Sequence, residues 1–100
     1  MKQKLAAAAV KKILFLPHAI KQMSRPDRMI TTDELRRAVL LGEIIEEYPE
    51  DQHGESCLVL YTTENRPIHV VCAPKTEYLA VITAYIPSPD QWAADFKTRK

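Results

Sequence analysis

Histidine and tyrosine side chains in this sequence could transfer protons, and arginine side chains could bind an anion. His18 and His69 lie in otherwise apolar stretches, LPHAI and PIHVV. An imidazole or a tyrosine hydroxyl can serve as a general acid or base, and a guanidinium suits negative charge on a phosphate. The residues that could supply this chemistry are His18, His69, Tyr61, Tyr85, Arg25 and Arg28.

His69 stands in the middle of RPIHVVCAP, which otherwise has the composition of a buried strand. Burying an imidazole without partners costs about 1 to 3 kcal/mol, so we expect His69 either to be hydrogen-bonded or to face a cleft. A two-residue turn after Pro74 would place it on the face of Ile82, and a three-residue turn would place it with Thr83 and Tyr85. Both registers are open at this point.

The remaining histidine and the cysteines offer weaker signals. His53 lies in DQHGE, a turn by composition, and is expected to be exposed and without a role. Cys57 and Cys72 do not form a CxxC motif, so we expect buried, reduced thiols, although a cross-strand disulfide is conceivable if the hairpin loop is even. A zinc site from these cysteines with His18 and His69 has no recognisable ligand spacing. We therefore expect no metal and no cofactor.

Size and composition are those of one ordinary globular domain spanning residues 1–100. A chain of 100 residues with 46% hydrophobic and 27% charged residues can fold around a core of its own. The start, MKQKLAAAAVKKILFLPHA, has too short and too interrupted an apolar run for a secretory leader. No stretch reaches the roughly 20 apolar residues that span a bilayer. We expect a cytoplasmic protein.

Charge is distributed unevenly. Residues 1–28 carry seven Lys or Arg and one Asp, whereas residues 29–65 carry two Arg and nine acidic residues. The basic end could meet phosphates or an acidic partner protein, or it could simply be a solvated surface. A pI near 7.8 is low for a nucleic-acid-binding domain of this size.

The first half of the chain predicts helices around one short strand. Residues 1–10 could form a short, frayed helical arm, and KILFL at 12–16 reads as a strand. Pro17 suits the first position of a helix that runs to about Ser24. Thr31 and Glu34 form a capping box for the next helix, and Gly42 is expected to end it in the left-handed conformation.

After Gly42 the hydrophobic period changes from 3.6 to 2, which predicts four strands within residues 43–48, 56–64, 68–74 and 77–87. Short connections favour antiparallel neighbours. Ser88 and Pro89 then predict a short helical turn that docks Trp92 and Phe96, and residues 97–100 are expected to be disordered. The predicted fold is α+β, β-α-α-β-β-β-β, a curved four- to five-stranded antiparallel sheet with two helices on one face.

The segments PHAIKQM, GEIIEEYPED, SCLVLY, RPIHVV and VITAYIP, in this order, resemble the prokaryotic family called domain of unknown function 4258 over about residues 12–92. This chain departs from that pattern at Gln22, where the family often has arginine, and in the longer RPDR turn. Any role that needs a guanidinium at position 22 is therefore in doubt. The order of elements is in turn similar to the RelE/ParE toxin superfamily, whose small basic members are held by a protein antitoxin and, in the RelE branch, cleave mRNA without a metal.

The resemblance implies a toxin-like module that acts on RNA. Such cleavage needs a base for the 2′-hydroxyl, a cation for the phosphate and an acid for the leaving 5′-oxygen. In this interpretation His18 and His69 are the acid and base, Arg28 is the phosphate clamp and Tyr85 assists. Arg25 and Tyr61 are expected to contact the substrate.

Each of these residues also has a structural interpretation. His18 could hydrogen-bond the preceding strand, Arg28 could pair with Asp33 or Glu34, and Tyr85 could pack against the helices. The alternative function is a non-catalytic interaction module in which the acidic strand EIIEEYPED or the basic amino-terminal arm binds a partner protein.

Overall fold

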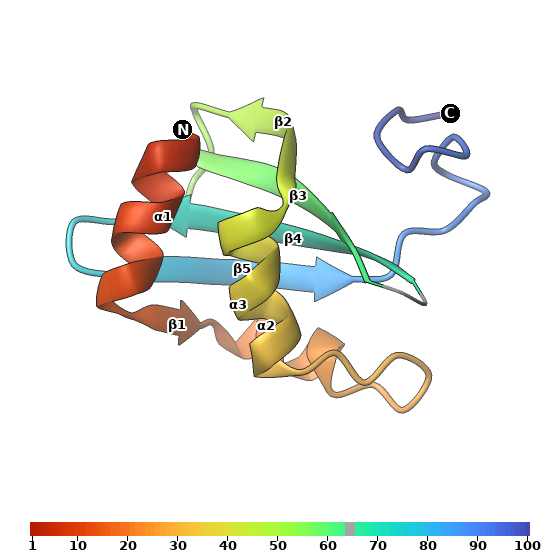
Figure 1. Ribbon diagram of the computed structural model, residues 1–100, viewed down its shortest axis with the longest axis horizontal. Helices are drawn as coiled ribbons and strands as arrows, with labels where there is room; N and C mark the ends of the chain where they lie inside the picture. The colour runs from red at the N-terminus through yellow and green to blue at the C-terminus, as the bar shows by residue number, and fades with distance from the viewer. Residues whose placement is uncertain (64–65) are drawn as a thin grey trace.

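The computed structural model describes residues 1–63 and 66–100. These residues form three helices and five strands in an α+β arrangement, which Figure 1 labels. In chain order they are α1 (Lys2–Lys11), β1 (Ile13–Phe15), α2 (Pro17–Met23), α3 (Thr32–Leu41), β2 (Glu43–Tyr48), β3 (Ser56–Thr62), β4 (Pro67–Pro74) and β5 (Leu79–Tyr85). The strand expected at residues 77–87 thus ends before Ile86. Glu64, the last residue of the strand expected at 56–64, lies outside the described residues.

The sheet is mixed and open, with strand order β1-β5-β4-β3-β2. Strands β2 to β5 form the expected antiparallel meander. Strand β1 instead runs parallel to β5, with Ile13 opposite Leu79 and Phe15 opposite Val81, so the prediction of an antiparallel sheet is wrong at this edge. Parallel neighbours need a long crossover, which is available here because two helices and three strands separate β1 from β5.

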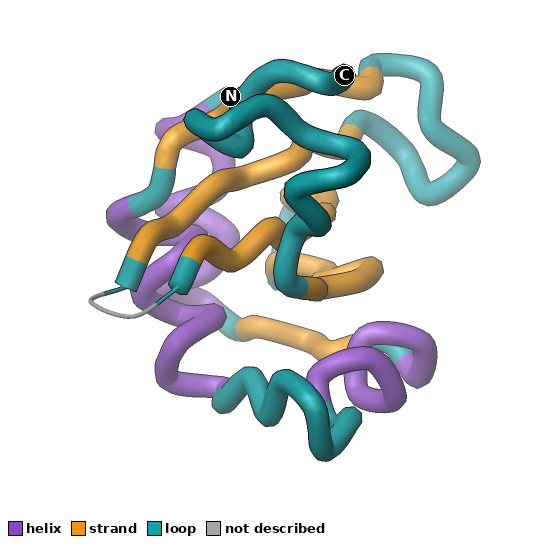
Figure 2. Tube along the Cα trace, turned by 90° about the vertical axis from the view of Figure 1, so that its right-hand side faces the viewer, coloured by secondary structure: helices purple, strands orange, loops and turns teal. Residues whose placement is uncertain are grey.

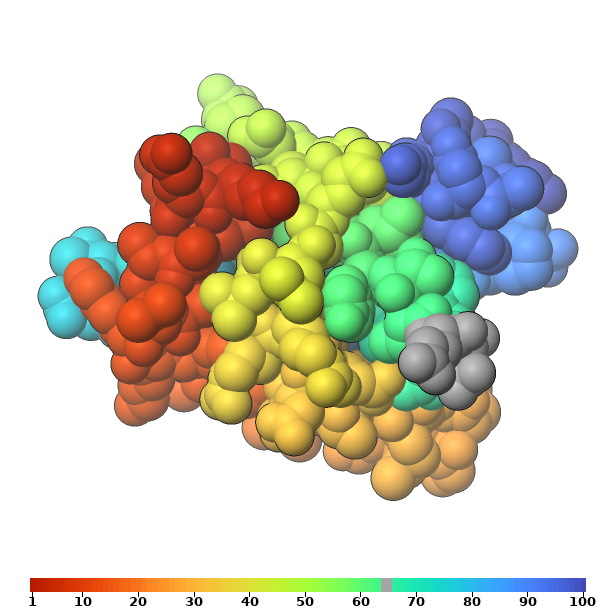
Figure 3. All heavy atoms as spheres, in the orientation of Figure 1, coloured from red at the N-terminus to blue at the C-terminus, as the bar shows by residue number. Residues whose placement is uncertain are grey.

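Helices α1 and α3 cover one face of the sheet, as Figures 1 and 3 show. Leu5 and Ala8 of α1 and Leu35 and Ala38 of α3 are buried against the strands. The segment that the sequence allowed as a frayed arm is therefore a third packed helix, because Leu5 and Ala8 are one turn apart and small neighbours let the helix approach the sheet. Within the described chain, no helix has the length and apolar character needed to cross a bilayer.

Helix α3 begins with the predicted capping box, which is confirmed. The Thr31 hydroxyl accepts a hydrogen bond from the Glu34 N–H, and the Glu34 carboxylate accepts one from the Thr31 N–H. The prediction for Gly42 is wrong: its φ of −74° and ψ of 176° are extended, not left-handed. Glycine is required here for space, since a Cβ would lie 2.5 Å from the Ala38 carbonyl oxygen and 2.5 Å from Cγ1 of Val59.

A β-bulge in β5 decides which face its last residues occupy. The β4–β5 hairpin pairs Pro74 with Leu79, and Lys75 N–H donates to the Tyr78 carbonyl, so neither expected register is found although the turn itself encloses two residues. The register then shifts at Ile82, the extra residue between two regular pairs. As a result His69 lies opposite Tyr85, on the face away from α1 and α3.

The carboxy-terminal segment, residues 86–100, packs at one end of the second face of the sheet, against His69 of β4 and against Glu43 and Glu46 of β2. Figure 1 shows it leaving the end of β5, and Figure 2, which looks from that side, shows it in front of the strand ends. Trp92 is buried and forms an isolated bridge with Arg99. The Ser88 hydroxyl accepts a hydrogen bond from the Asp90 N–H, but the predicted helical turn is wrong beyond this single turn, because the chain reverses after Trp92.

Candidate active site

An open cleft of about 450 Å³ lies between α2, the loop that follows it, the end of β5 and the start of the carboxy-terminal segment. We call it the α2–β5 cleft. Its lining comes from two parts of the chain that are far apart in sequence, residues 18–28 and 83–91: His18, Gln22, Arg28, Thr83, Tyr85, Ile86, Ser88 and Gln91. Most of these side chains are polar, and they combine a histidine, an arginine and a tyrosine.

Helix α2 presents His18 and Gln22 to the cleft because they are one helical turn apart. Pro17 at the first helical position fixes the start of the helix, and Ala19 and Met23 are buried on its other side. His18 is exposed and, among the described residues, makes no hydrogen bond to β1. Its imidazole is therefore available to a ligand.

Arg28 reaches the cleft from the loop between α2 and α3. Its side chain is only 14% exposed, and Nε lies 3.9 Å from the Asp27 carboxylate. Nη1 donates a hydrogen bond to Oε1 of Gln22 at 3.4 Å. Neither Asp33 nor Glu34 forms an ion pair with Arg28 within the described chain, since the Glu34 carboxylate binds Arg66 instead. A guanidinium thus lies beside position 22 although that residue is a glutamine.

Tyr85 forms the wall of the cleft next to a buried histidine. Oη of Tyr85 is 3.3 Å from Nδ1 of His69, and Nε2 of His69 is 2.8 Å from the Phe96 carbonyl oxygen. Because a carbonyl only accepts, Nε2 must carry the proton, and in the neutral ring Nδ1 then accepts from the Tyr85 hydroxyl. The imidazole also packs edge-on against Trp92, with ring centroids 4.5 Å apart.

Burial sets the protonation of this pair. It lowers the pKa of His69, although the Phe96 carbonyl and the Glu46 carboxylate act in the opposite direction. Burial also raises the pKa of Tyr85. At neutral pH the histidine is therefore neutral and the tyrosine protonated. His69 has no exposed surface and meets the cleft only through Tyr85.

The cleft brings together three of the six residues that the sequence singled out. His18, Arg28 and Tyr85 line it, while His69 lies behind Tyr85. Arg25 is exposed and pairs with Asp27 at 3.4 Å, outside the lining. Tyr61 packs against the core on the helix side of the sheet and is not among the residues that line the cleft.

Four of the lining residues were not among the candidates from the sequence: Gln22, Ile86, Ser88 and Gln91, whereas Thr83 lies beside Tyr85 in one of the two possible registers. Only the spacing of Gln22 from His18 carried a local signal, since residues four apart share a helix face. Thr83 comes to the cleft through the bulge at Ile82, and Ser88 and Gln91 through the turn that follows β5, in which the Gln91 N–H donates to the Ser88 carbonyl.

The remaining candidates lie elsewhere. His53 is half-buried, with Nδ1 3.1 Å from the Asp51 carboxylate. Cys57 and Cys72 are free thiols directly opposite each other, and the hydrogen bond with Cys57 together with burial raises the pKa of Cys72. They face the helices whereas His69 faces the other way, so these residues do not converge on a metal. No group of three or more His, Cys, Asp or Glu suited to a metal ion occurs among the residues that the structure describes.

Comparison with known proteins gives one family and no individual relative. No curated protein and no solved structure shows a significant match. A family model described as "Domain of unknown function (DUF4258)" matches residues 15–86, which include His18, Arg28, His69 and Tyr85. The match covers most of the chain, including all of α2, α3 and β2 to β5. The chain therefore belongs to the DUF4258 family.

Proposed function

We propose that the α2–β5 cleft binds the backbone of RNA and cleaves it by acid/base chemistry. One observation carries the proposal: His18, Arg28 and Tyr85, from three separate segments, line the same open cleft. Two groups that can transfer protons and one guanidinium are the set that phosphodiester cleavage needs.

In the proposed reaction the His18 imidazole takes the proton of a ribose 2′-hydroxyl. The 2′-oxygen then attacks the adjacent phosphorus. The Tyr85 hydroxyl turns from Nδ1 of His69 and gives its one proton to the 5′-oxygen as the bond from phosphorus to that oxygen breaks. The products are a 2′,3′-cyclic phosphate and a free 5′-hydroxyl. His18 then releases a proton to water and Tyr85 regains one from water.

Arg28 would bind the non-bridging phosphate oxygens, where negative charge grows in the transition state. Its side chain is nearly buried, and its Nε has no hydrogen-bond partner among the described residues. Anchored donors of this kind need little reorganisation during reaction. This favours the role that the sequence suggested for Arg28.

His69 has a different role in this proposal from the one expected from sequence. Because it is sealed behind Tyr85, it acts on the tyrosine and not on the RNA. In the resting protein its Nδ1 accepts the hydrogen bond of the Tyr85 hydroxyl and so holds the tyrosine in place, and the Phe96 carbonyl fixes the tautomer that makes Nδ1 an acceptor.

The alternative function, a non-catalytic module that binds a partner protein, has less support. Helix α1 is packed on the core, and Glu43 and Glu46 of the acidic strand already pair with Lys97 and Arg99. An antitoxin-like protein partner stays part of the proposal through the resemblance in element order to the RelE/ParE toxins, which is analogy at the level of fold.

The experiment is to incubate the purified protein with end-labelled single-stranded RNA, with and without ribosomes, and to identify the product ends. We expect 2′,3′-cyclic phosphate products, and a loss of about 100-fold or more in rate for His18→Ala and for Arg28→Ala. His53→Ala and Arg36→Ala are matched controls from outside the cleft. An inactive wild type under both conditions, or equal rates in all variants, would rule the proposal out.

A further inference from the structure

We propose that Arg66 is a positioning residue for Arg28: it holds the loop that carries the Arg28 side chain into the α2–β5 cleft. This inference rests on the proposed function of that cleft. Arg66 does not line the cleft and immediately precedes β4, 38 residues away from Arg28 in sequence.

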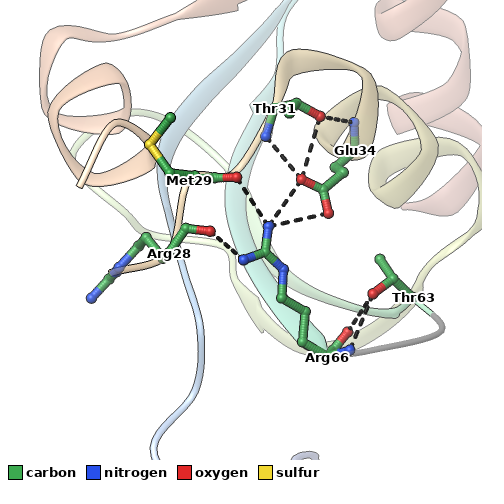
Figure 4. A network of polar contacts seen from close by, with 6 residues as sticks. All are labelled: Arg28, Met29, Thr31, Glu34, Thr63 and Arg66. Atoms are coloured by element: carbon green, nitrogen blue, oxygen red, sulfur yellow. Dashed lines mark hydrogen bonds and ion pairs between the residues drawn. The ribbon is translucent and has the colours of Figure 1, made fainter. Parts of the chain in front are cut away.

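The guanidinium of Arg66 joins three segments of the chain, as Figure 4 shows. Nη1 donates to the carbonyl oxygen of Arg28, and Nη2 donates to the carbonyl oxygen of Met29 at 3.1 Å. Nη2 also lies 3.0 and 3.2 Å from the two carboxylate oxygens of Glu34. One side chain therefore fixes two successive carbonyl groups of the loop and the first turn of α3.

The loop needs such an anchor because its backbone is strained at Met29. The φ of Met29 is 44°, in the left-handed region, where a residue with a side chain is held only by its surroundings. Met29 is 61% exposed, so packing of its side chain supplies little restraint, and its N–H donates to the Arg25 carbonyl within the same loop at 2.9 Å. Its carbonyl group points at Arg66, whose hydrogen bond is available to hold this conformation.

Arg66 is itself fixed on the sheet. Its N–H donates to the Thr63 hydroxyl at 3.1 Å, and its carbonyl oxygen accepts from the Thr63 N–H at 2.9 Å. The loop that presents Arg28 is thus tied through Arg66 to the end of the β3–β4 pair. A rigid element behind a loop residue is what keeps a phosphate clamp in a productive geometry.

The Glu34 carboxylate forms an ion pair with the Arg66 guanidinium. The carboxylate also accepts from the Thr31 N–H at 3.0 Å, so the capping box of α3 and the Arg66 ion pair share one group. The pairing neutralises Arg66, which reduces its repulsion of Arg28. Lysine could not replace Arg66 fully, because a compact ammonium lacks the planar fork that reaches several acceptors at once.

The test is a double-mutant cycle on RNA cleavage with Arg28→Ala, Arg66→Ala and the double variant. We expect Arg66→Ala to lower kcat about tenfold with little change in KM, Arg66→Lys to restore part of it, and the double variant to be no slower than Arg28→Ala. Arg37→Ala, an exposed arginine of α3, is the matched control. If kcat of the double variant falls by the product of the two single losses, the two residues act independently and the proposal is overturned.

A second readout does not depend on RNA. Amide hydrogen exchange of residues 28–30 should be at least about tenfold faster in Arg66→Ala than in the wild type, while amides of β4 and β5 stay protected. If Arg66→Ala does not fold, Glu34→Gln serves instead, since glutamine keeps the capping box and removes the charge partner. Unchanged exchange in the loop would refute the role of Arg66. An inactive wild type with faster loop exchange would refute only the proposed function.

Discussion

Tyr85, which lines the cleft, donates a hydrogen bond through its hydroxyl to a histidine with no exposed surface, Oη lying 3.3 Å from Nδ1 of His69. The other nitrogen of His69 binds the carbonyl of Phe96, whose φ is 57°. Arg28 has an analogous support, because Arg66 binds the carbonyl of Met29, also at positive φ. Two strained backbone positions thus lie directly behind two residues of the cleft.

Tyr85→Phe should remove the proposed acid. We expect the single-turnover rate of RNA cleavage to fall by about 100-fold or more, since general acid/base groups contribute 10²- to 10⁴-fold. The cost in stability should be about 1 to 3 kcal/mol, because Nδ1 of the buried His69 loses its donor. Tyr48→Phe is the control: this hydroxyl donates to Glu46, away from the cleft. Full activity in Tyr85→Phe would show that the tyrosine is not the acid.

The pKa of His69 predicts how stability depends on pH. Burial lowers it below the ordinary value of 6.5, with the Glu46 carboxylate raising it and the Arg99 guanidinium lowering it. The unfolded chain therefore binds more protons than the folded chain once the pH falls below about 6.5. The contribution of His69 to the free energy of unfolding is complete above that pH and is lost as the pH falls toward the lowered pKa.

Urea midpoints at pH 7.5 and pH 5.0 measure this contribution. The wild type should lose more stability between the two pH values than His69→Gln, which keeps a donor for the Phe96 carbonyl but does not titrate. His53→Gln, which changes a partly exposed histidine, should behave like the wild type in this comparison. An identical loss of stability in the wild type and in His69→Gln would contradict a lowered pKa for His69.

Local features of the fold were predictable from the sequence, whereas long-range ones were not. The capping box of Thr31 and Glu34 depends on residues three apart, and the strands from β2 to β5 follow from alternating β-branched and aromatic residues. The parallel pairing of β1 with β5 and the bulge at Ile82 have no local signature. Both depend on how distant segments pack.

The same distinction applies to the candidate site. His18, Arg28 and Tyr85 were found because their residue types carry chemistry. Arg66 was missed since its partners are 32 to 38 residues away in sequence. The burial of His69 was foreseen as one of two possibilities, but its cover, Trp92, comes from a reversal of the chain that no periodic pattern predicts.

Gly42→Ala should destabilise the fold although the backbone conformation suits alanine. The new Cβ would meet the Ala38 carbonyl, the Val59 side chain and, at 2.8 Å, the Leu60 carbonyl oxygen. We expect a loss of about 1 to 3 kcal/mol in the free energy of unfolding, measured by urea denaturation. Leu41→Ala, at a neighbouring residue that is 67% exposed, should cost no more than about 0.5 kcal/mol. Equal effects of the two substitutions would mean that space at Gly42 is not limiting.

Trp92→Ala tests whether the carboxy-terminal segment is an integral part of the fold. Trp92 is 2% exposed, covers the ring of His69 and lies beneath the guanidinium of Arg99 at 4.6 Å. Removing a buried aromatic side chain should cost about 3 to 5 kcal/mol. Ile20→Ala, at a hydrophobic residue that is 52% exposed, is the control. A loss no greater than that of the control would indicate that the segment contributes little to the stability of the sheet.

The central claim, that RNA binds at the α2–β5 cleft, is tested most directly by NMR titration with a 2′-O-methylated oligoribonucleotide, which lacks the attacking hydroxyl. We expect shift changes concentrated at the residues that line the cleft, above all His18, Arg28 and Tyr85, and their loss in Arg28→Ala. A second hollow, with Lys4, Lys11 and Lys75 in its lining, lies between α1 and the β4–β5 turn. Chemical-shift changes centred there, or no chemical-shift changes at all, would contradict the account.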